Sequence, residues 1–159
     1  MATDALQIEF ATADDAPIIL QFIRELAEFE KLLHEVTATE QQIKESMFGE
    51  RKHAEAIIAR LDGNPVGFAL FFHNYSTFQS KPGIYLEDLF VQPTARDKGI
   101  GKALLQKLAA IARERNCGRL QWVVLNWNAQ AIRFYEELGA EGQKDWVPFR
   151  LQGEALEKL

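Results

Sequence analysis

The fold is best predicted from the stretch Tyr85-Leu-Glu-Asp-Leu-Phe-Val-Gln-Pro-Thr-Ala-Arg-Asp-Lys-Gly-Ile-Gly-Lys-Ala-Leu-Leu-Gln-Lys-Leu108. It begins with a β-branched and aromatic run, passes through Pro93, and enters an amphipathic helical pattern. Gly99 and Gly101 therefore lie where a strand ends and a helix begins. The first amide groups of a helix have no intrahelical partner and attract anions, so this turn is predicted to bind phosphate.

The composition is typical of an ordinary globular protein. Of 159 residues, 47% are hydrophobic and 26% charged, and no repeat or linker divides them, so we expect one domain over residues 1–159. A net charge of −5 argues against a nucleic-acid partner. The N-terminus lacks a signal-peptide pattern, and no apolar run reaches the roughly 20 residues that span a bilayer. We predict a cytoplasmic protein without a membrane partner.

Nothing in the sequence indicates a metal site. The single cysteine, Cys117, excludes an intrachain disulfide and leaves no thiol cluster. The three histidines, His34, His53 and His73, do not have metal-ligand spacing. We therefore predict no metal cofactor.

Periodicity predicts an α/β domain with the order β-α-α-β-β-β-α-β-α-β. The expected strands cover residues 6–10, 54–61, 66–72, 84–91, 119–125 and 147–151. The expected helices begin at a cap at Thr12 or Asp14, at a capping box of Thr39 and Gln42, near Gly99, and at Asn128. The first is expected to reach Leu33, and residues 74–83 are predicted to be a loop.

Two familiar phosphate motifs do not match. A P-loop would need glycine at Arg96 and Ser or Thr at Ala103. A dinucleotide fingerprint would need a small residue at Leu104 and a strand near the start of a βαβ unit. What remains is Arg-x-x-Gly-x-Gly after a strand with acidic residues.

That sequence, Arg96-Asp-Lys-Gly99-Ile-Gly101, resembles the acetyl-CoA motif of the GNAT superfamily of N-acetyltransferases. Other segments are similar to its diamine acetyltransferase branch, which includes spermidine/spermine and thialysine N-acetyltransferases. They are Arg24–Glu30, Val66–Ala69, Tyr85–Val91, Trp127–Asn128 and Phe134–Tyr135. The resemblance covers nearly the whole chain. It implies a mixed, mostly antiparallel sheet flanked by helices, acetyl-CoA as co-substrate, a small amine as acceptor, and a homodimer.

The resemblance also implies the cofactor residues. The main chain of Leu89, Phe90 and Val91 would pair with the pantetheine arm, and the Val91 amide would stabilise the oxyanion. The pyrophosphate would lie against Arg96, Asp97, Lys98, Gly99, Ile100, Gly101 and Lys102. For Asn128, local sequence favours a helix N-cap and the resemblance adds a hydrogen bond to the cofactor, and both can hold.

Acetyl transfer needs a base for the amine and an acid for the leaving thiolate. Strict alternation places Tyr85, Glu87, Leu89 and Val91 on one strand face and Asp88 on the other, so Glu87 is expected in an apolar row with a raised pKa. A salt-bridged strand residue is the alternative, but the resemblance implies that Glu87 is the base. It likewise implies that Tyr135 is the acid, although a core aromatic explains the same position. Asp88 could contact substrate or anchor a neighbouring element.

The resemblance places Phe29 and Glu30 at the amine site, with Glu87 and Asp88. Ser76 and Phe78 stand where spermidine enzymes carry an acidic residue and a tryptophan, and Ser76 with Thr77 resembles the thialysine type. We therefore expect a small mono- or diamine or a lysine-like amino acid rather than spermine. A protein or peptide N-acetyltransferase and a non-catalytic acetyl-CoA-binding protein are the alternatives.

Overall fold

A computed structural model describes residues 5–159 and divides into two compact units. The first unit ends at Trp122, and the second is Val123–Leu159. Residues 1–4 begin the segment that is predicted to carry no signal peptide, and they lie outside the described residues.

A five-stranded sheet in the order β1-β2-β3-β4-β5 forms the centre of the first unit. The strands are β1 (Leu6–Phe10), β2 (Glu55–Leu61), β3 (Asn64–Ser76), β4 (Lys81–Val91) and β5 (Leu120–Gln121). The first four are antiparallel neighbours, and β5 pairs parallel to β4. The predicted mixed, mostly antiparallel sheet is confirmed.

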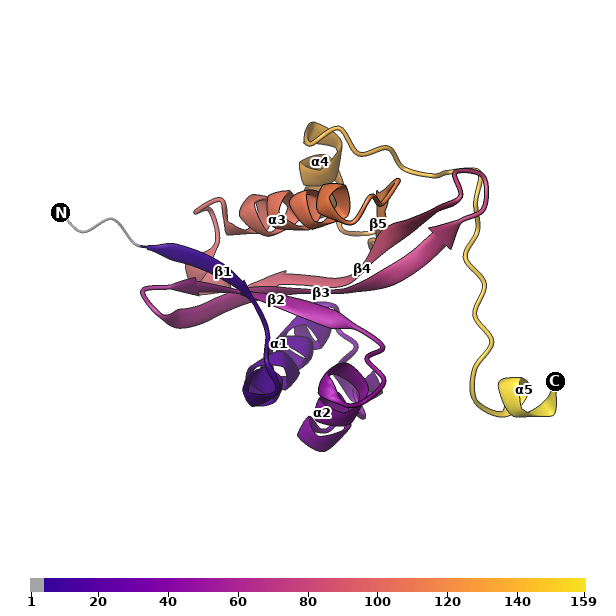
Figure 1. Cartoon of the computed structure of the whole chain (residues 1–159), viewed down its shortest axis with the longest axis horizontal. Helices are drawn as coiled ribbons and strands as arrows, with labels where there is room; N and C mark the ends of the chain where they lie inside the picture. The colour runs from indigo at the N-terminus through magenta and orange to yellow at the C-terminus, as the bar shows by residue number, and fades with distance from the viewer. Residues whose placement is uncertain (1–4) are drawn as a thin grey trace. The chain divides into compact units, whose positions relative to one another are not determined.

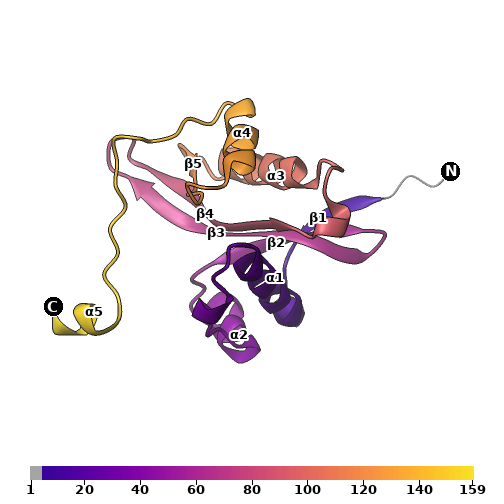
Figure 2. The same cartoon turned by 180° about the vertical axis from the view of Figure 1, so that it is seen from behind.

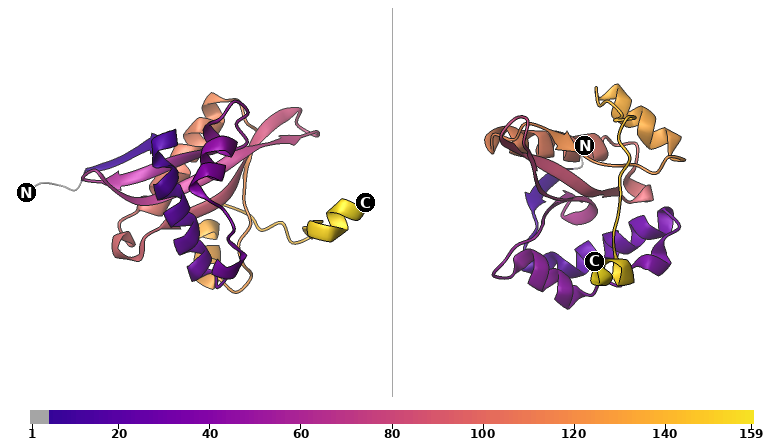
Figure 3. Two further views of the ribbon diagram at one scale, coloured as in Figure 1. Left: turned by 90° about the horizontal axis from the view of Figure 1, so that it is seen from below. Right: turned by 90° about the vertical axis from the view of Figure 1, so that its right-hand side faces the viewer.

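Helices cover both faces of this sheet (Figures 1 and 2). Helix α1 (Ala16–Phe29) and helix α2 (Glu40–Phe48) lie on one face, and α3 (Ile100–Glu114) lies on the other. Figure 3 shows α1 and α2 next to each other below the sheet. Short 3₁₀ turns, η1 (Ala13–Asp15), η2 (Leu33–Glu35) and η3 (Pro93–Ala95), precede or follow these helices. No helix within residues 5–159 is long and apolar enough to cross a membrane.

The helix starts follow from local sequence. Thr39 and Gln42 form the predicted capping box, in which the Gln42 amide donates to the Thr39 hydroxyl at 3.2 Å. Thr12 forms a similar box with Asp15 ahead of α1, and Pro17 occupies the first turn of α1. Such caps satisfy amide groups that the helix leaves unpaired, and each contributes about 1 kcal/mol.

Aromatic packing fixes α1 on the sheet. The ring of Phe22 lies 5.4 Å from that of Phe68 on β3 and 6.0 Å from that of Phe90 on β4, centre to centre. All three side chains are buried, and each fully buried phenylalanine contributes roughly 1.5–3 kcal/mol. On the opposite face, α3 buries the apolar stripe that its sequence predicts: Ile100, Leu104, Leu105, Leu108, Ile111 and Ala112.

Two boundary predictions in the first unit are wrong. The segment predicted as a loop over 74–83 is mostly hairpin, because β3 runs to Ser76 and β4 begins at Lys81. Backbone pairing overrides the polar composition there, and only residues 77–80 turn. The first helix ends at Phe29, so Leu33 belongs to η2 and is exposed.

The second unit differs from prediction at its end. Helix α4 (Ala129–Glu137) is present as expected, and α5 (Gly153–Lys158) closes the chain. The predicted strand over 147–151 is absent from the described structure, and Val147 and Phe149 are exposed. A strand forms only where a neighbour satisfies its backbone, and no neighbouring strand is assigned to this segment.

The strand predicted over 119–125 is also shorter than expected. In the structure it is limited to β5, Leu120–Gln121, at the end of the first unit.

Candidate active site

The glycine loop, residues 96–101, joins η3 to α3 through two left-handed backbone positions. Asp97 has φ of 64° and Gly99, the N-cap of α3, has φ of 76°. A Cβ built at Gly99 would meet no heavy atom within 4 Å, so backbone conformation rather than crowding favours glycine. Left-handed residues beside a helix start turn successive amides toward one point, which is suited to an anion.

Side chains at this loop differ in how much they can contribute. The side chain of Ile100 is buried, so only its main chain can face a ligand. Lys98 and Lys102 are exposed and supply positive charge at the start of α3. The Arg96 side chain is also exposed, but its Nε donates to the carbonyl oxygen of Val91 at 3.0 Å.

The end of β4 has an open edge. On the β5 side, the structure pairs only Ile84 and Tyr85 with β5, so among the described residues 86–91 have no strand neighbour there. The amide of Gln92 donates to Val66 of β3 at 2.8 Å. Because alternate residues of an antiparallel strand bond to the same neighbour, Leu89 and Val91 direct their backbone groups away from β3. The backbone groups of Leu89 and the N–H of Val91 can pair with an extended ligand, while the Val91 oxygen accepts from Arg96.

A β-bulge in β4 interrupts the alternation of side chains between the two faces of the sheet at Glu87. Asp88 pairs with Leu70, yet Leu86 pairs with the next residue, Phe71, so Glu87 is the additional residue. The bulge therefore overturns the expected row of Tyr85, Glu87 and Leu89, since Leu86 and Asp88 now lie on opposite faces. Glu87 is exposed rather than buried among apolar side chains.

Asp88 is the half-buried carboxylate of this strand. Its strand partner Leu70 packs against the α1–α2 core, so Asp88 is on that face. Burial, with the nearby charges of Glu87 and Glu30, raises the pKa of Asp88 to about 6. Burial also raises the pKa of Glu30. We call Glu30, Glu87 and Asp88 the carboxylate group.

The carboxylate group lies where a cation is favoured. Glu30 caps the C-terminal end of α1, directly after Phe29, and the carbonyl end of a helix carries partial negative charge. Carboxylates that lie near one another gain from a positive ligand. Among residues 5–159, the structure contains no group of three or more His, Cys, Asp or Glu side chains suited to a metal ion. The arrangement suits an ammonium group.

The second unit carries two predicted site residues. Asn128 is the N-cap of α4, and its side-chain oxygen accepts from the Ala131 amide at 3.2 Å, which confirms its local interpretation. Tyr135 is half-buried on α4, and its ring centre lies 5.5 Å from that of Phe134. This contact joins neighbours in the chain on a helix that buries no residue, so the core-aromatic interpretation and the catalytic role of Tyr135 both stay predictions.

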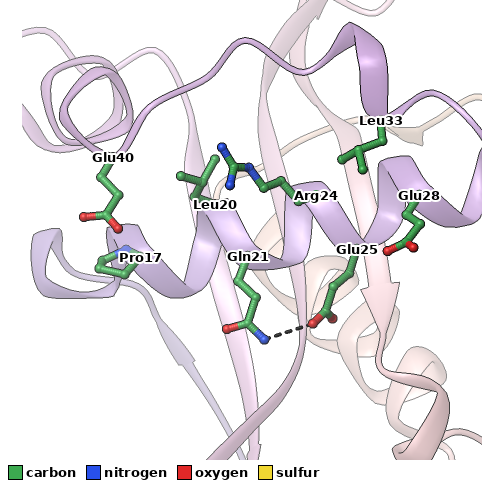
Figure 4. A pocket seen from close by; sticks show the side chains of 8 residues that line it. All are labelled: Pro17, Leu20, Gln21, Arg24, Glu25, Glu28, Leu33 and Glu40. Atoms are coloured by element: carbon green, nitrogen blue, oxygen red, sulfur yellow. Dashed lines mark hydrogen bonds between the residues drawn. The ribbon is translucent and has the colours of Figure 1, made fainter.

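A separate groove of about 330 Å³ runs along α1 (Figure 4). Its lining residues are Pro17, Leu20, Gln21, Arg24, Glu25, Glu28, Leu33 and Glu40. None of the predicted site residues lines it. Gln21 donates to Glu25 at 2.9 Å across this surface, as the dashed line marks. The groove is thus distinct from the carboxylate group and the glycine loop.

Sequence reasoning missed two features. The bulge at Glu87 has no signal in the alternation of residues 85–91, because a bulge depends on pairing with β3. Gln92 was not singled out either, although its side chain donates to Glu25 at 3.3 Å. The only indication of a role for Gln92 in the sequence was its position between β4 and the glycine loop.

Comparison with known proteins identifies the family. The model of the "Acetyltransferase (GNAT) family" matches residues 20–140. The chain belongs to the GNAT acetyltransferase family. It is therefore an acyltransferase that uses acetyl-CoA as co-substrate for N-acetylation.

Relatives of this GNAT acetyltransferase match along nearly its whole length. A thialysine N-epsilon-acetyltransferase of Mus musculus is 35% identical, over 96% of each chain. An L-ornithine N5-acetyltransferase of Arabidopsis thaliana is 31% identical, over 96% of this chain and 87% of the relative. An integron cassette protein from the mobile metagenome of V. cholerae has a solved structure with a TM-score of 0.82 and 28% identity, over 98% of each chain. The predicted fold and branch are confirmed.

Proposed function

We propose that this acetyltransferase moves the acetyl group of acetyl-CoA onto the terminal amine of a small diamine or a lysine-like amino acid. The observation that carries the proposal is the carboxylate group on β4 and α1, in which burial and the charges of Glu87 and Glu30 raise the pKa of Asp88 to about 6. Carboxylates clustered in this way favour an ammonium substrate over a neutral one.

The acetyl group would be held by the open edge of β4. The pantetheine arm pairs with the main chain of Leu89, Phe90 and Val91 as an added strand, and the Val91 amide donates to the thioester carbonyl. The main chain of residues 96–102 surrounds the pyrophosphate, with charge from Lys98 and Lys102, and Asn128 bonds to the cofactor. Left-handed Asp97 and Gly99 support this role for the loop.

Transfer is direct in this proposal. Glu87 takes a proton from the ammonium, itself or through water, and the neutral nitrogen attacks the thioester carbon. The C–N bond forms, the attached nitrogen loses its second proton to solvent, and the C–S bond breaks as the tetrahedral oxyanion collapses. The Tyr135 hydroxyl protonates the departing thiolate and recovers its proton from solvent. An exposed Glu87 suits exchange with water, while the half-buried Asp88 and Glu30, with Phe29, bind the amine.

The nature of the amine follows from the relatives and from the hairpin. Two relatives are named for thialysine and L-ornithine, amino acids with a distal amine. At the β3–β4 turn, Ser76 is buried and Phe78 is fully exposed, and neither offers a carboxylate for an additional ammonium. A short amine is therefore preferred over spermine.

The decisive experiment measures thiol release from acetyl-CoA with ornithine, lysine, thialysine, putrescine, spermidine, spermine and a lysine peptide. We expect the highest kcat/KM for the amino acids or the short diamine. Preference for the peptide would favour a protein acetyltransferase. Tight CoA binding without turnover of any amine would leave only the acetyl-CoA-binding alternative.

A Tyr135→Phe variant tests the acid role. Loss of a general acid lowers kcat by about 10²- to 10⁴-fold, whereas loss of a packing hydroxyl changes stability but not the rate of the chemical step. Equal turnover of both proteins from pH 6 to pH 10 would reject the role.

Three wider predictions complete the proposal. The family model matches residues on both sides of Trp122, which supports both units acting as one acetyltransferase domain. Homodimerisation is expected from the resemblance, and light scattering would measure it. The cytoplasmic location stays a prediction from the sequence, and cell fractionation would test it.

A further inference from the structure

Arg96 belongs to the acetyl-CoA motif, yet its side chain contacts α1 and β4. Its guanidinium carbon lies 5.2 Å from the ring centre of Phe29, the last residue of α1. It lies 5.9 Å from the ring centre of Phe90 on β4. Both distances are within the range of about 6 Å for cation–π contacts. The guanidinium thus bridges an aromatic side chain of α1 and one of β4.

The bond from Arg96 to Val91 anchors this bridge. The peptide between Val91 and Gln92 is held at both ends, because its oxygen accepts from Arg96 at 3.0 Å and its N–H donates to Val66 at 2.8 Å. Phe90 is buried and packs at a tilt against Phe22 of α1. Arg96 is therefore well placed to hold an exposed partner against a buried one.

Phe29 is that partner, since its side chain is 43% exposed. A second contact joins the same segments, because Gln92 donates to Glu25 at 3.3 Å. Glu25 and Phe29 are four residues apart and lie on one face of α1. The C-terminal half of α1 is thus attached to the segment after β4 at two points, and Glu30 follows immediately.

We propose that Arg96 is a positioning residue of the amine site, which holds Phe29 and Glu30 in place through its guanidinium, while only its main chain serves the cofactor. The proposal rests on the proposed function of the carboxylate group as the amine site. It has a consequence for binding order. A loop fixed by bound acetyl-CoA also fixes the end of α1, so the cofactor increases the affinity for the amine.

The test separates the KM for amine from the KM for acetyl-CoA. In Arg96→Lys, the charge stays but the planar stack and the Nε donor are lost. We expect KM for the amine to rise about tenfold, on the order of the contribution of one cation–π contact, with KM for acetyl-CoA changed less than about twofold. Arg96→Gln removes the charge as well, and should leave the salt dependence of acetyl-CoA binding unchanged.

A double-mutant cycle tests whether Arg96 acts on the amine site through Phe29. If Arg96 acts through Phe29, then Phe29→Leu raises KM for the amine, and adding Arg96→Lys raises it little further. Lys44→Gln, at an exposed position of α2, is the control for a change of charge. A raised KM for acetyl-CoA with an unchanged KM for the amine would assign Arg96 to the phosphates and overturn the proposal, as would full additivity with Phe29→Leu. Failure of the wild-type enzyme to acetylate any amine would instead reject the proposed function.

Discussion

The glycine loop and the carboxylate group differ in the part of the chain that forms them. The loop presents main-chain amides, and its requirements are backbone conformations at Asp97 and Gly99. The carboxylate group presents side chains, Glu30 from α1 and Glu87 and Asp88 from β4, which only folding brings together. Amides do not titrate and tolerate varied side chains, whereas carboxylates depend on pH and on each residue. Substitutions should therefore act differently in the two regions.

The largest expected effect is that of Glu87→Gln. The amide has the same shape but cannot accept a proton, so kcat should fall about 10²- to 10⁴-fold, with little change in KM for acetyl-CoA. Steady-state assays at saturating cofactor measure this. Glu50→Gln, at an exposed site outside both regions, is the matched control. An unchanged kcat would transfer the role of base to another group, with Asp88 as the first candidate.

The next prediction concerns stability and Asp88. Because its pKa is raised from 3.8 to about 6 in the folded protein, the folded state binds more protons than the unfolded state between these values, and stability falls as pH rises through this window. Asp88→Asn should therefore increase the free energy of unfolding at pH 7.5 by up to about 3 kcal/mol, and have little effect near pH 4. Denaturant unfolding at both pH values measures this.

The same variant should lose amine affinity. In the wild-type enzyme, KM for the amine should fall as pH rises through about 6, because Asp88 becomes charged. Asp88→Asn should remove this inflection while KM for acetyl-CoA stays constant. A variant that is destabilised at pH 7.5, or one that keeps the inflection, would contradict a carboxylate of raised pKa at the amine site.

Gly99→Val probes the main-chain region. A β-branched residue at φ of 76° is strained, by roughly 1–2 kcal/mol, so acetyl-CoA affinity should fall about 5- to 30-fold if that strain distorts the loop. Calorimetric titration with CoA measures it. Gly142→Val, at a site where a Cβ would meet nothing within 4 Å and φ is not positive, is the control. Equal CoA affinity for both variants would mean that the loop conformation is not required.

The smallest effect is expected for Lys102→Ala. An exposed charge contributes about 0.2–1 kcal/mol, so KM for acetyl-CoA should rise less than about fivefold, and the difference should vanish in high salt. Kinetic assays at low and high ionic strength measure it. If Lys102→Ala lost more acetyl-CoA affinity than Gly99→Val, the distinction between a main-chain cofactor site and a side-chain amine site would fail, because side chains would then dominate the cofactor region as well.

The sequence predicts the glycine loop well because its signals are local. Pro93, Gly99 and the apolar stripe of α3 lie within one short segment, and each acts on its own backbone or its own helix. The cap at Thr39 is predicted for the same reason. The amine region was predicted less well. Its residues were named through resemblance and stay predictions, and the environments of Glu87 and Asp88 were interchanged.

These errors share one physical cause, which is pairing between distant segments. The register of β3 against β4 creates the bulge at Glu87, and it also turns the predicted loop over 74–83 into a hairpin. Alternating apolar residues over 147–151 predicted a strand, but a strand needs a neighbour that the alternation does not supply.

By itself the sequence determined the strand–glycine–helix turn, the helix caps and the family, because these depend on residues that are neighbours along the chain. Only the tertiary structure decided that Asp88 is half-buried, that Glu87 leaves the strand alternation, and that Arg96 reaches Phe29. Burial, strand register and contacts between α1 and β4 arise from residues that are distant in sequence, so no local pattern encodes them.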